Sequence, residues 1–283
     1  MIKKAVITAG GLGTRFLPFT KEFPREMLPL FCRDKEKIIV KPLLQISFEA
    51  LFSIGIRNFC FVVGRGKRSI EDYFTPDKKH LEYLKTKNIV ASRQLEKFYE
   101  KLEESEITWK QQPAPIGFGD AVYRAKSFVG SDDFIVWAGD DYIHSPNNDF
   151  IRNLISTFEE NNAKAVLSAE RVPNPERFGV IFGKEITKGL YKVSKIVEKP
   201  KNPESNLTAV AIYVFSPEIF NSIEKIPFGV NNEKQLTDAI QGLIDQNYNV
   251  FAEELNVNAI RIDVGKPESY KLALERSHVL LKG

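Results

Sequence analysis

The sequence has little from which to build a metal cluster or a disulfide framework. Its 283 residues include two cysteines, Cys32 and Cys60, and three histidines scattered along the chain. The cysteines lie far apart and form no metal-ligand spacing, so a zinc site is not expected. Two cysteines also give no support for an oxidising compartment, and we expect a cytoplasmic protein.

Long hydrophobic runs and a strong net charge are also lacking. No run approaches the roughly 18 apolar residues of a membrane span, and the first residues do not resemble a signal peptide. Lys and Arg number 40 and Asp and Glu 37, which leaves a net charge of +3. That balance argues against binding to nucleic acid through bulk charge. With 43% hydrophobic residues, the composition is typical of a folded globular protein.

The order of apolar runs and turn residues predicts an α/β fold. Residues 5–7 form a strand that leads into a glycine-rich loop, a helix follows around residues 44–52, and residues 58–63 form a second strand. This order favours a parallel sheet with a right-handed crossover. Further strands are expected at 107–110, 133–138, 164–169, 179–183, 191–198, 209–215, 249–252 and 258–262. Further helices are expected at 67–74, 117–128, 149–160, 217–225, 235–246 and 267–281.

The expected sheet is mixed, because the strands between residues 164 and 215 follow one another too closely to be all parallel. We find no internal repeat and no linker, so a single domain is expected. The Lys/Glu-rich segment 76–105 is expected to be helical and to form a solvated surface insertion.

A glycine-rich loop follows the first strand. The backbone N–H groups around Gly10, Gly11 and Gly13 can line an anion site. A dinucleotide fingerprint would need a third glycine where Phe16 stands, and the Gly-Lys-Ser/Thr of a Walker A loop is absent. The loop therefore indicates a phosphate-binding site of some other type.

Three cations follow the glycines within eleven residues: Arg15, Lys21 and Arg25. Pro18 and Pro24 separate them, and we expect these prolines to hold an extended path. Three cations on a stiff loop beside a glycine nest are typical of a polyphosphate clamp. The alternative is a basic surface loop that makes salt bridges.

Two predicted strands end in aspartate. Asp140 and Asp141 follow the buried strand 133–138, and Asp263 ends another strand before Gly265. Ligands of open α/β sheets bind at the carboxyl ends of strands, and two carboxylates with phosphate oxygens suit Mg²⁺. We expect Asp141 to cap the next helix instead.

Glu198 and Lys199 end a further strand, directly before Pro200. Neighbours on a strand point to opposite faces, so both can reach one ligand only if the strand ends or kinks there. Glu198 could then bind sugar hydroxyls and Lys199 a phosphate. The alternative is an exposed ion pair.

Together these segments resemble the nucleotidyltransferases that activate sugar 1-phosphates, most closely the uridylyltransferases that act on glucose 1-phosphate. The resemblance spans nearly the whole chain. It rests on GLGTRFLP at 11–18, on Thr20 and Lys21, and on PREMLP at 24–29. Later pieces agree in order, at residues 112, 117–119, 139–140, 178–180, 197–200, 235–239 and 263–265.

The resemblance implies a Rossmann-like mixed, mainly parallel sheet flanked by helices, and a role for each matched residue. The nucleotide would be bound by Ala9, Gly10, Gly11, Gly13, Thr14, Arg15, Lys21, Arg25, Gln112 and Gly117. Within that set Gln112 and Gly117 would face the uracil. The sugar phosphate would be bound by Gly179, Glu198 and Lys199, and Mg²⁺ by Asp140 and Asp263. Arg15, Arg25 and Lys199 would be the catalytic cations.

The resemblance also implies the reaction: UTP and glucose 1-phosphate would give UDP-glucose and pyrophosphate. The nucleotide-binding half would be residues 1–145, the sugar-phosphate half 146–265, and a C-terminal helix 266–283. A homo-oligomer, dimer or tetramer, is expected. Alternatives are the same chemistry on dTTP and glucose 1-phosphate or on UTP and an N-acetylated sugar 1-phosphate, or a non-catalytic sugar-nucleotide sensor.

Three positions depart from the family pattern. Arg25 stands where the family usually has Lys, and it keeps the charge but is a planar fork rather than a point charge. Asp120 stands where a His is usual, and Ala211 where a Gly is common. Arg25 and Ala211 could both touch substrate.

Overall fold

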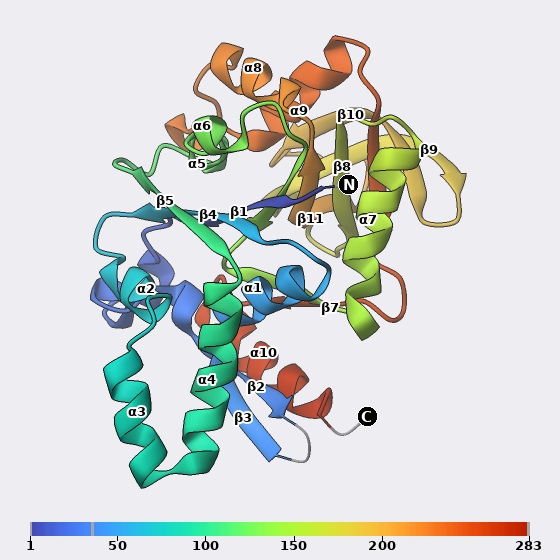
Figure 1. Cartoon of the computed structure of the whole chain (residues 1–283). Coiled ribbons are helices and arrows are strands. Elements are labelled where there is room, and N and C mark those ends of the chain that lie inside the picture. The colour runs from blue at the N-terminus through green and yellow to red at the C-terminus, as the bar shows by residue number, and fades with distance from the viewer. Residues whose placement is uncertain (1, 35–36, 282–283) are drawn as a thin grey trace.

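Nine strands of the computed structural model form one sheet between two layers of helices (Figure 1). The structure describes residues 2–34 and 37–281, apart from the side chain of Ala211. The strand order is β5 (Glu106–Gln112), β4 (Asn58–Gly64), β1 (Lys4–Ala9), β6 (Phe134–Ala138), β11 (Leu207–Phe215), β8 (Ala165–Arg171), β12 (Val250–Glu254), β10 (Leu190–Glu198) and β9 (Gly179–Thr187). Strands β10 and β11 run against the other seven. The expected mixed, mainly parallel sheet is confirmed.

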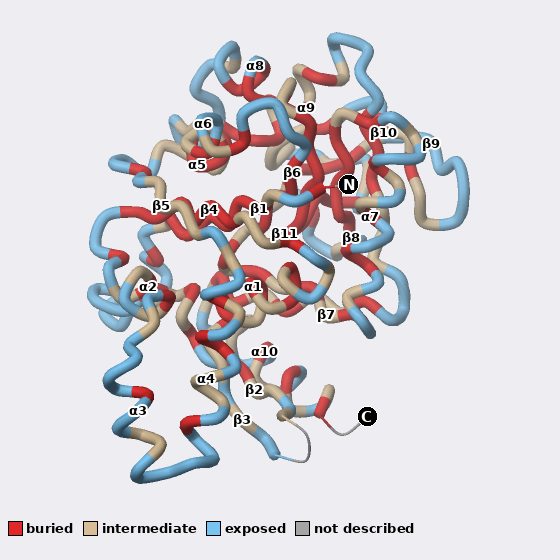
Figure 2. The backbone as a smooth tube through the Cα atoms, viewed as in Figure 1, coloured by how far each residue is buried: buried red, intermediate tan, exposed pale blue. Residues whose placement is uncertain are grey.

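Both faces of the central strands are buried, which is why their sequences are continuously apolar. On β1, Ala5 and Ile7 pack on one face and Val6 on the other. One face is covered by α1 (Leu43–Ser53), α4 (Ile89–Glu103) and α7 (Asp149–Glu160). The other is covered by α5 (Phe118–Tyr123), α6 (Lys126–Val129), α8 (Glu218–Lys225) and α9 (Leu236–Asp245). Figure 2 shows the buried residues concentrated along the strands and the inner sides of the helices.

The helical insertion expected at 76–105 is only partly solvated. It is a hairpin of α3 (Lys78–Lys87) and α4, next to the short helix α2 (Arg68–Tyr73). Phe98 and Leu102 of α4 are buried in the core against α1. The expectation of a solvated surface insertion is therefore wrong for the inner side of α4, because that apolar side faces the sheet layer rather than water.

Two small sheets lie outside the main one. The hairpin of β2 (Pro29–Asp34) and β3 (Lys37–Pro42) and the strand β7 (Asp141–His144) were not predicted, whereas β13 (Ile260–Asp263) and α10 (Pro267–Val279) were. β13 pairs with β7, and α10 packs beside β2 over a small core of its own. The helix expected at 117–128 is divided into α5 and α6. Within the described ranges, no helix has both the length and the apolar character that crossing a membrane requires.

Candidate active site

Two neighbouring pockets lie where β1, β5, β6 and β8 end, the edge at which α/β sheets bind ligands. The glycine pocket is lined by the loop after β1 together with Arg25, Gln112 and Gly117. The acidic pocket is lined by Asp140, Asp141, Gly179, Glu198, Lys199, Arg261 and Asp263, among others. The two share Arg15, Phe118, Asp140 and Glu233, so a ligand in one pocket would meet a ligand in the other.

Close contacts explain why the loop after β1 is made of glycine. A Cβ on Gly10 would lie 2.1 Å from Oε1 of Gln112, and a Cβ on Gly11 would lie 3.1 Å from Nη2 of Arg25. Gly13 has a φ of 64°, in the left-handed region. Beneath the pocket, a Cβ on Gly64 would lie 2.7 Å from the backbone oxygen of Gly10. Thr14 also lines this pocket, whereas Ala9 is buried in the core below it.

The path from residue 14 to residue 27 is not extended, so that expectation is wrong. The chain makes three single 3₁₀ turns, at Thr14–Phe16, Phe19–Lys21 and Arg25–Met27. The prolines precede the second and third turns, because a fixed φ near −65° suits entry into a helical turn as well as an extended path.

These turns separate the three cations. Arg15 is exposed and lines both pockets. Arg25 is half-buried, and its Nη2 lies 2.6 Å from Oδ2 of Asp140. Lys21 is 78% exposed and pairs with Glu22 at 3.7 Å, outside the described lining of both pockets. The geometry brings Arg15 and Arg25 to the site and leaves Lys21 in solvent.

Glu26, which sequence reasoning passed over, lies at the floor of the glycine pocket. It is buried, and its Oε2 accepts a hydrogen bond of 2.8 Å from Nζ of buried Lys67. Burial raises the pKa of Glu26, and the neighbouring Lys67 and Arg25 oppose that shift. The sequence signal that could have identified Glu26 is its position directly after Arg25, within the PREMLP segment at 24–29 that resembles the family.

Gln112 is 4% exposed and belongs to the wall of the glycine pocket. Its Nε2 donates 3.0 Å hydrogen bonds to the backbone oxygen of Gly117 and to Oδ2 of Asp120. Gly117 has a φ of 116°, so the turn before α5 requires glycine. The structure therefore brings together Gly10, Gln112 and Gly117, as the predicted base site requires.

The pairing of β7 with β13 brings the two predicted metal ligands, Asp140 and Asp263, to the same pocket. Asp263 lies opposite Asp141 in that ladder, and the N–H of Val264 donates to the backbone oxygen of Asp140 at 3.1 Å. Oδ1 of Asp263 accepts from the N–H of Gly265 at 2.7 Å. Two carboxylates at one pocket edge are a donor set that fits a hard divalent cation completed by phosphate oxygens. Among the described residues no group of three or more His, Cys, Asp or Glu side chains could hold a metal.

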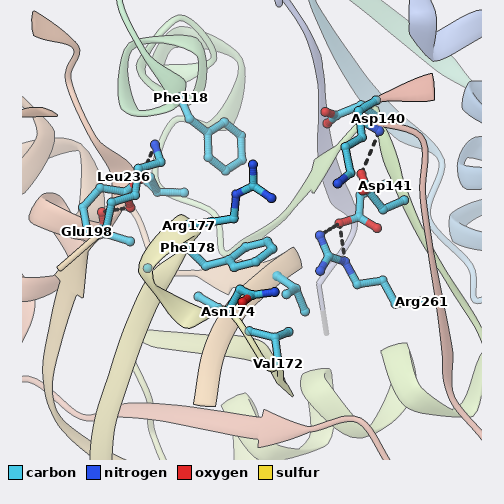
Figure 3. Close-up of a pocket in the computed structure, with 18 of the residues that line it drawn as sticks. Phe118, Asp140, Asp141, Val172, Asn174, Arg177, Phe178, Glu198, Leu236 and Arg261 are labelled. Atoms are coloured by element: carbon cyan, nitrogen blue, oxygen red, sulfur yellow. Dashed lines mark hydrogen bonds and ion pairs between the residues drawn. The ribbon is translucent and has the colours of Figure 1, made fainter. Parts of the chain in front are cut away.

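Asp141 does not cap a helix; it begins β7, so that expectation is wrong. Its Oδ2 lies 2.7 Å from Nε and 2.6 Å from Nη2 of Arg261. Burial raises the pKa of Asp141, and the positive charge of Arg261 opposes that shift. Arg261 also contacts Glu170 at 3.2 Å. This buried pair, which sequence reasoning missed, joins β7 to β13 beside Asp140 and Asp263, the predicted metal ligands (Figure 3).

The opposite end of the acidic pocket carries the predicted sugar-phosphate residues. Thr208 on β11 pairs with Val180 on β9, which brings the start of β9 back to this edge. Oε1 of Glu198 lies 2.8 Å from Nζ of Lys199. In Figure 3, Glu198 and the Asp140–Asp141 pair lie at opposite sides, with Phe118, Arg177 and Phe178 between them.

A kink at the end of β10 lets Glu198 and Lys199 face one pocket. The strand ends at Glu198, and Lys199 has a φ of 43°, a strained conformation for a residue other than glycine. Oε2 of Glu198 accepts a 2.8 Å hydrogen bond from Thr237, a residue that sequence reasoning did not assign. A Cβ on Gly179 would lie 2.3 Å from Cγ2 of Thr237, so glycine is needed for this contact.

The cysteines take no part in the site. Burial raises the pKa of Cys32 to about 11 and that of Cys60 to about 12. Both thiols are therefore protonated at neutral pH and unsuited to nucleophilic attack. The site instead contains carboxylates, cationic side chains and backbone N–H donors, and these groups are suited to binding and aligning phosphates.

Known proteins of one family are similar to this chain over almost all of its length. The family model described as nucleotidyl transferase matches residues 4–278. A "UTP--glucose-1-phosphate uridylyltransferase 2" of Streptococcus pyogenes serotype M1 is 39% identical over 93% of this chain and 86% of its own. A "Putative UTP--glucose-1-phosphate uridylyltransferase" of Methanocaldococcus jannaschii is 37% identical over 94% and 89%.

Solved structures agree with these relatives. An apo UDP-glucose pyrophosphorylase superposes with a TM-score of 0.86 at 30% identity, covering 100% of this chain and 99% of its own. A UTP-bound UGPase from Acinetobacter baumannii superposes with a TM-score of 0.83 at 30% identity, covering 100% and 95%.

Proposed function

Because this chain belongs to the nucleotidyl transferase family, we propose that it converts UTP and glucose 1-phosphate into UDP-glucose and pyrophosphate. One observation carries the proposal: a glycine-lined pocket and a pocket with paired acidic and basic side chains meet at Arg15 and Asp140. The names of the relatives support the choice of uridine and glucose.

The glycine pocket would hold UTP. Gly10, Gly11 and Gly13 let the nucleotide approach the backbone, whose N–H groups suit phosphate oxygens. Gln112 and Gly117 would border the base. Arg15 would contact the triphosphate, and so would Arg25 once it turns from Asp140.

The acidic pocket would hold glucose 1-phosphate. Glu198, held by Thr237, is placed to accept hydrogen bonds from sugar hydroxyls, and Lys199 is placed to bind the phosphate. Gly179 lets Thr237 pack closely enough to hold Glu198 in this position.

In the reaction, an oxygen of the sugar phosphate attacks the α-phosphorus of UTP. The new P–O bond forms as the bond between the α-phosphorus and the bridging oxygen breaks, and pyrophosphate leaves on the opposite side. The attacking phosphate is already ionised at neutral pH, so the site needs no general base. Catalysis then consists of alignment and of charge neutralisation by Arg15, Arg25 and Lys199.

Asp140 and Asp263 would hold Mg²⁺, which would supply further neutralisation of the phosphate charge. In the structure Arg25 already pairs with Asp140, so it neutralises one of these carboxylates before any nucleotide binds. Arg25 is thus placed to exchange Asp140 for the triphosphate.

A substrate panel tests the proposal. Purified protein with Mg²⁺ is incubated with UTP, dTTP, CTP, ATP or GTP and with glucose 1-phosphate or an N-acetylated hexosamine 1-phosphate, and pyrophosphate release is measured. Fastest release with UTP and glucose 1-phosphate supports the proposal. Faster release with dTTP or with the N-acetylated sugar 1-phosphate would change the assignment of the substrates. Failure of every pair to release pyrophosphate would favour the non-catalytic sugar-nucleotide sensor.

We also infer that the nucleotide-binding half, residues 1–145, and the sugar-phosphate half, residues 146–265, belong to one domain. The continuous nine-stranded sheet supports this inference. The homo-oligomeric state and the cytoplasmic location stay predictions from the resemblance and the composition. Light scattering after gel filtration would test the first, and fractionation of the source cells the second.

A further inference from the structure

Asp120 stands behind the base site, and the proposed reaction gives it no role. We propose that Asp120, held by Arg124, is a positioning residue that fixes the amide of Gln112 with its oxygen toward the base. The glycine pocket would then select bases that carry an N–H donor at the position facing Gln112, as uracil and thymine do and cytosine does not. This inference rests on the proposed function insofar as it takes the glycine pocket as the nucleotide site.

The orientation of the Gln112 amide follows from its two partners. The backbone oxygen of Gly117 and the carboxylate of Asp120 are both 3.0 Å from the same amide atom. Both partners can only accept hydrogen bonds, so the atom facing them must be the NH₂ group. Both amide protons of Gln112 are thereby engaged, and the opposite orientation would set three oxygens against one another.

Asp120 is itself held in place. Its side chain is 6% exposed, and Arg124, four residues later at the C-terminal cap of α5, donates to both of its oxygens. The distances are 2.8 Å from Nη2 to Oδ1 and 3.2 Å from Nε to Oδ2. Charge-assisted contacts of this forked kind are stronger and more directional than neutral ones. Arg124 therefore restrains the carboxylate that restrains Gln112.

The free end of Gln112 lies where a base would bind. Its Oε1, for which the described residues provide no hydrogen bond, lies over Gly10 in the glycine pocket. Uracil and thymine can donate their N3–H to that oxygen. Cytosine presents a lone pair at N3, so two acceptors would face each other in a buried position at the cost of an unmade hydrogen bond. The restraint cannot separate uracil from thymine, which differ elsewhere.

The experiment measures binding of UTP and CTP by calorimetry, with and without Asp120. Wild type is expected to bind UTP more tightly than CTP. In Asp120→Ala the amide can reverse, so the ratio of the two affinities should fall by about tenfold, the equivalent of about 1.4 kcal/mol. Asp120→Asn should give a smaller fall, since one oxygen remains. The KM for glucose 1-phosphate should not change in either variant, because the acidic pocket is not altered.

Two further variants separate positioning from general stability. Asp72→Ala removes an exposed Arg–Asp pair of the same i,i+4 spacing on α2 and should leave the affinity ratio unchanged. In a Gln112→Ala background, Asp120→Ala should have no further effect on the ratio, because it acts through the amide.

An unchanged ratio in Asp120→Ala, or equal binding of UTP and CTP by wild type, overturns the inference even if the enzyme turns over normally. An additional fall in the Gln112→Ala background also overturns it. If wild type prefers UTP in binding but releases no pyrophosphate with any sugar phosphate, the proposed function fails while this inference stands.

Discussion

The two pockets achieve binding in opposite ways. The glycine pocket is made by leaving side chains out: Gly10, Gly11 and Gly13 bring the backbone to its surface. The acidic pocket is made by pairing side chains, as Glu198 with Lys199 and Asp141 with Arg261. One pocket is therefore sensitive to an added atom and the other to a removed charge.

This difference predicts which substitutions damage which substrate. An added Cβ in the glycine pocket should weaken binding of the nucleotide and leave binding of the sugar phosphate unchanged. A lost partner in the acidic pocket should do the reverse, because it leaves a charged group without its neighbour. The charged groups that would act on the reacting phosphates, whether in one pocket or shared by both, should affect the chemistry itself.

The largest effect is expected at the two carboxylates that would hold Mg²⁺. Asp140→Asn and Asp263→Asn should each lower kcat by about a thousandfold, as losses of a metal carboxylate, and leave the fold intact. Steady-state kinetics at limiting Mg²⁺ measures the effect, and thermal unfolding checks the fold. Asp72→Asn, at an exposed carboxylate, is the control. A kcat within about threefold of wild type, under 0.7 kcal/mol, would remove that residue from the metal site.

In the glycine pocket, Gly10→Ala should raise the KM for UTP by about a hundredfold, about 2.7 kcal/mol, and leave glucose 1-phosphate unaffected. Its new Cβ would overlap Oε1 of Gln112, which must move from the base site. Gly242→Ala is the matched control, since a Cβ in α9 would stand 3.4 Å from Ser222, an ordinary contact. Equal changes in both KM values would contradict the separation of the pockets.

In the acidic pocket, Lys199→Ala should raise the KM for glucose 1-phosphate by about thirtyfold and that for UTP much less. The loss corresponds to about 2 kcal/mol, as for a charge-assisted hydrogen bond to phosphate. Lys201→Ala, at an exposed lysine two residues later, is the control. Unchanged kcat and KM for glucose 1-phosphate would show that Lys199 is a surface residue.

The smallest effects sharpen the assignment of the cations. Arg25→Ala should lower kcat by about tenfold, the order of one lost charge-assisted contact, and Arg25→Lys should lower it less. Lys21→Ala should change kcat by less than about twofold, since its ammonium is exposed and exposed pairs contribute little. Near-normal kcat in Arg25→Ala with a collapse in Lys21→Ala would transfer the clamp to Lys21.

The features that sequence reasoning found are contiguous in the chain. Each can be recognised from a few neighbouring residues: the glycine loop, the aspartates at strand ends, and the adjacent Glu198 and Lys199. The apolar run of β1 and the helical period of α7 likewise follow from local patterns.

The features that it missed join distant segments. Asp141 meets Arg261 across 120 residues through the pairing of β7 with β13, and Glu198 meets Thr237 across 39 through the packing of α9 on β10. No local pattern reveals either contact. The role assigned to Lys21 assumed an extended loop, whereas single 3₁₀ turns rotate neighbouring cations away from one another. Ala211, expected to touch substrate, has its side chain outside the described part of the chain.

The close approach of Gly64 to Gly10 has a consequence for tolerance to mutation. Gly64 ends β4 and belongs to the sheet beneath the pocket, yet the 2.7 Å separation leaves no space for even a methyl group below the loop. A random substitution there would lift the nucleotide loop from underneath. In a deep mutational scan, Gly64 should therefore be as intolerant as Gly10, although no ligand would ever touch it.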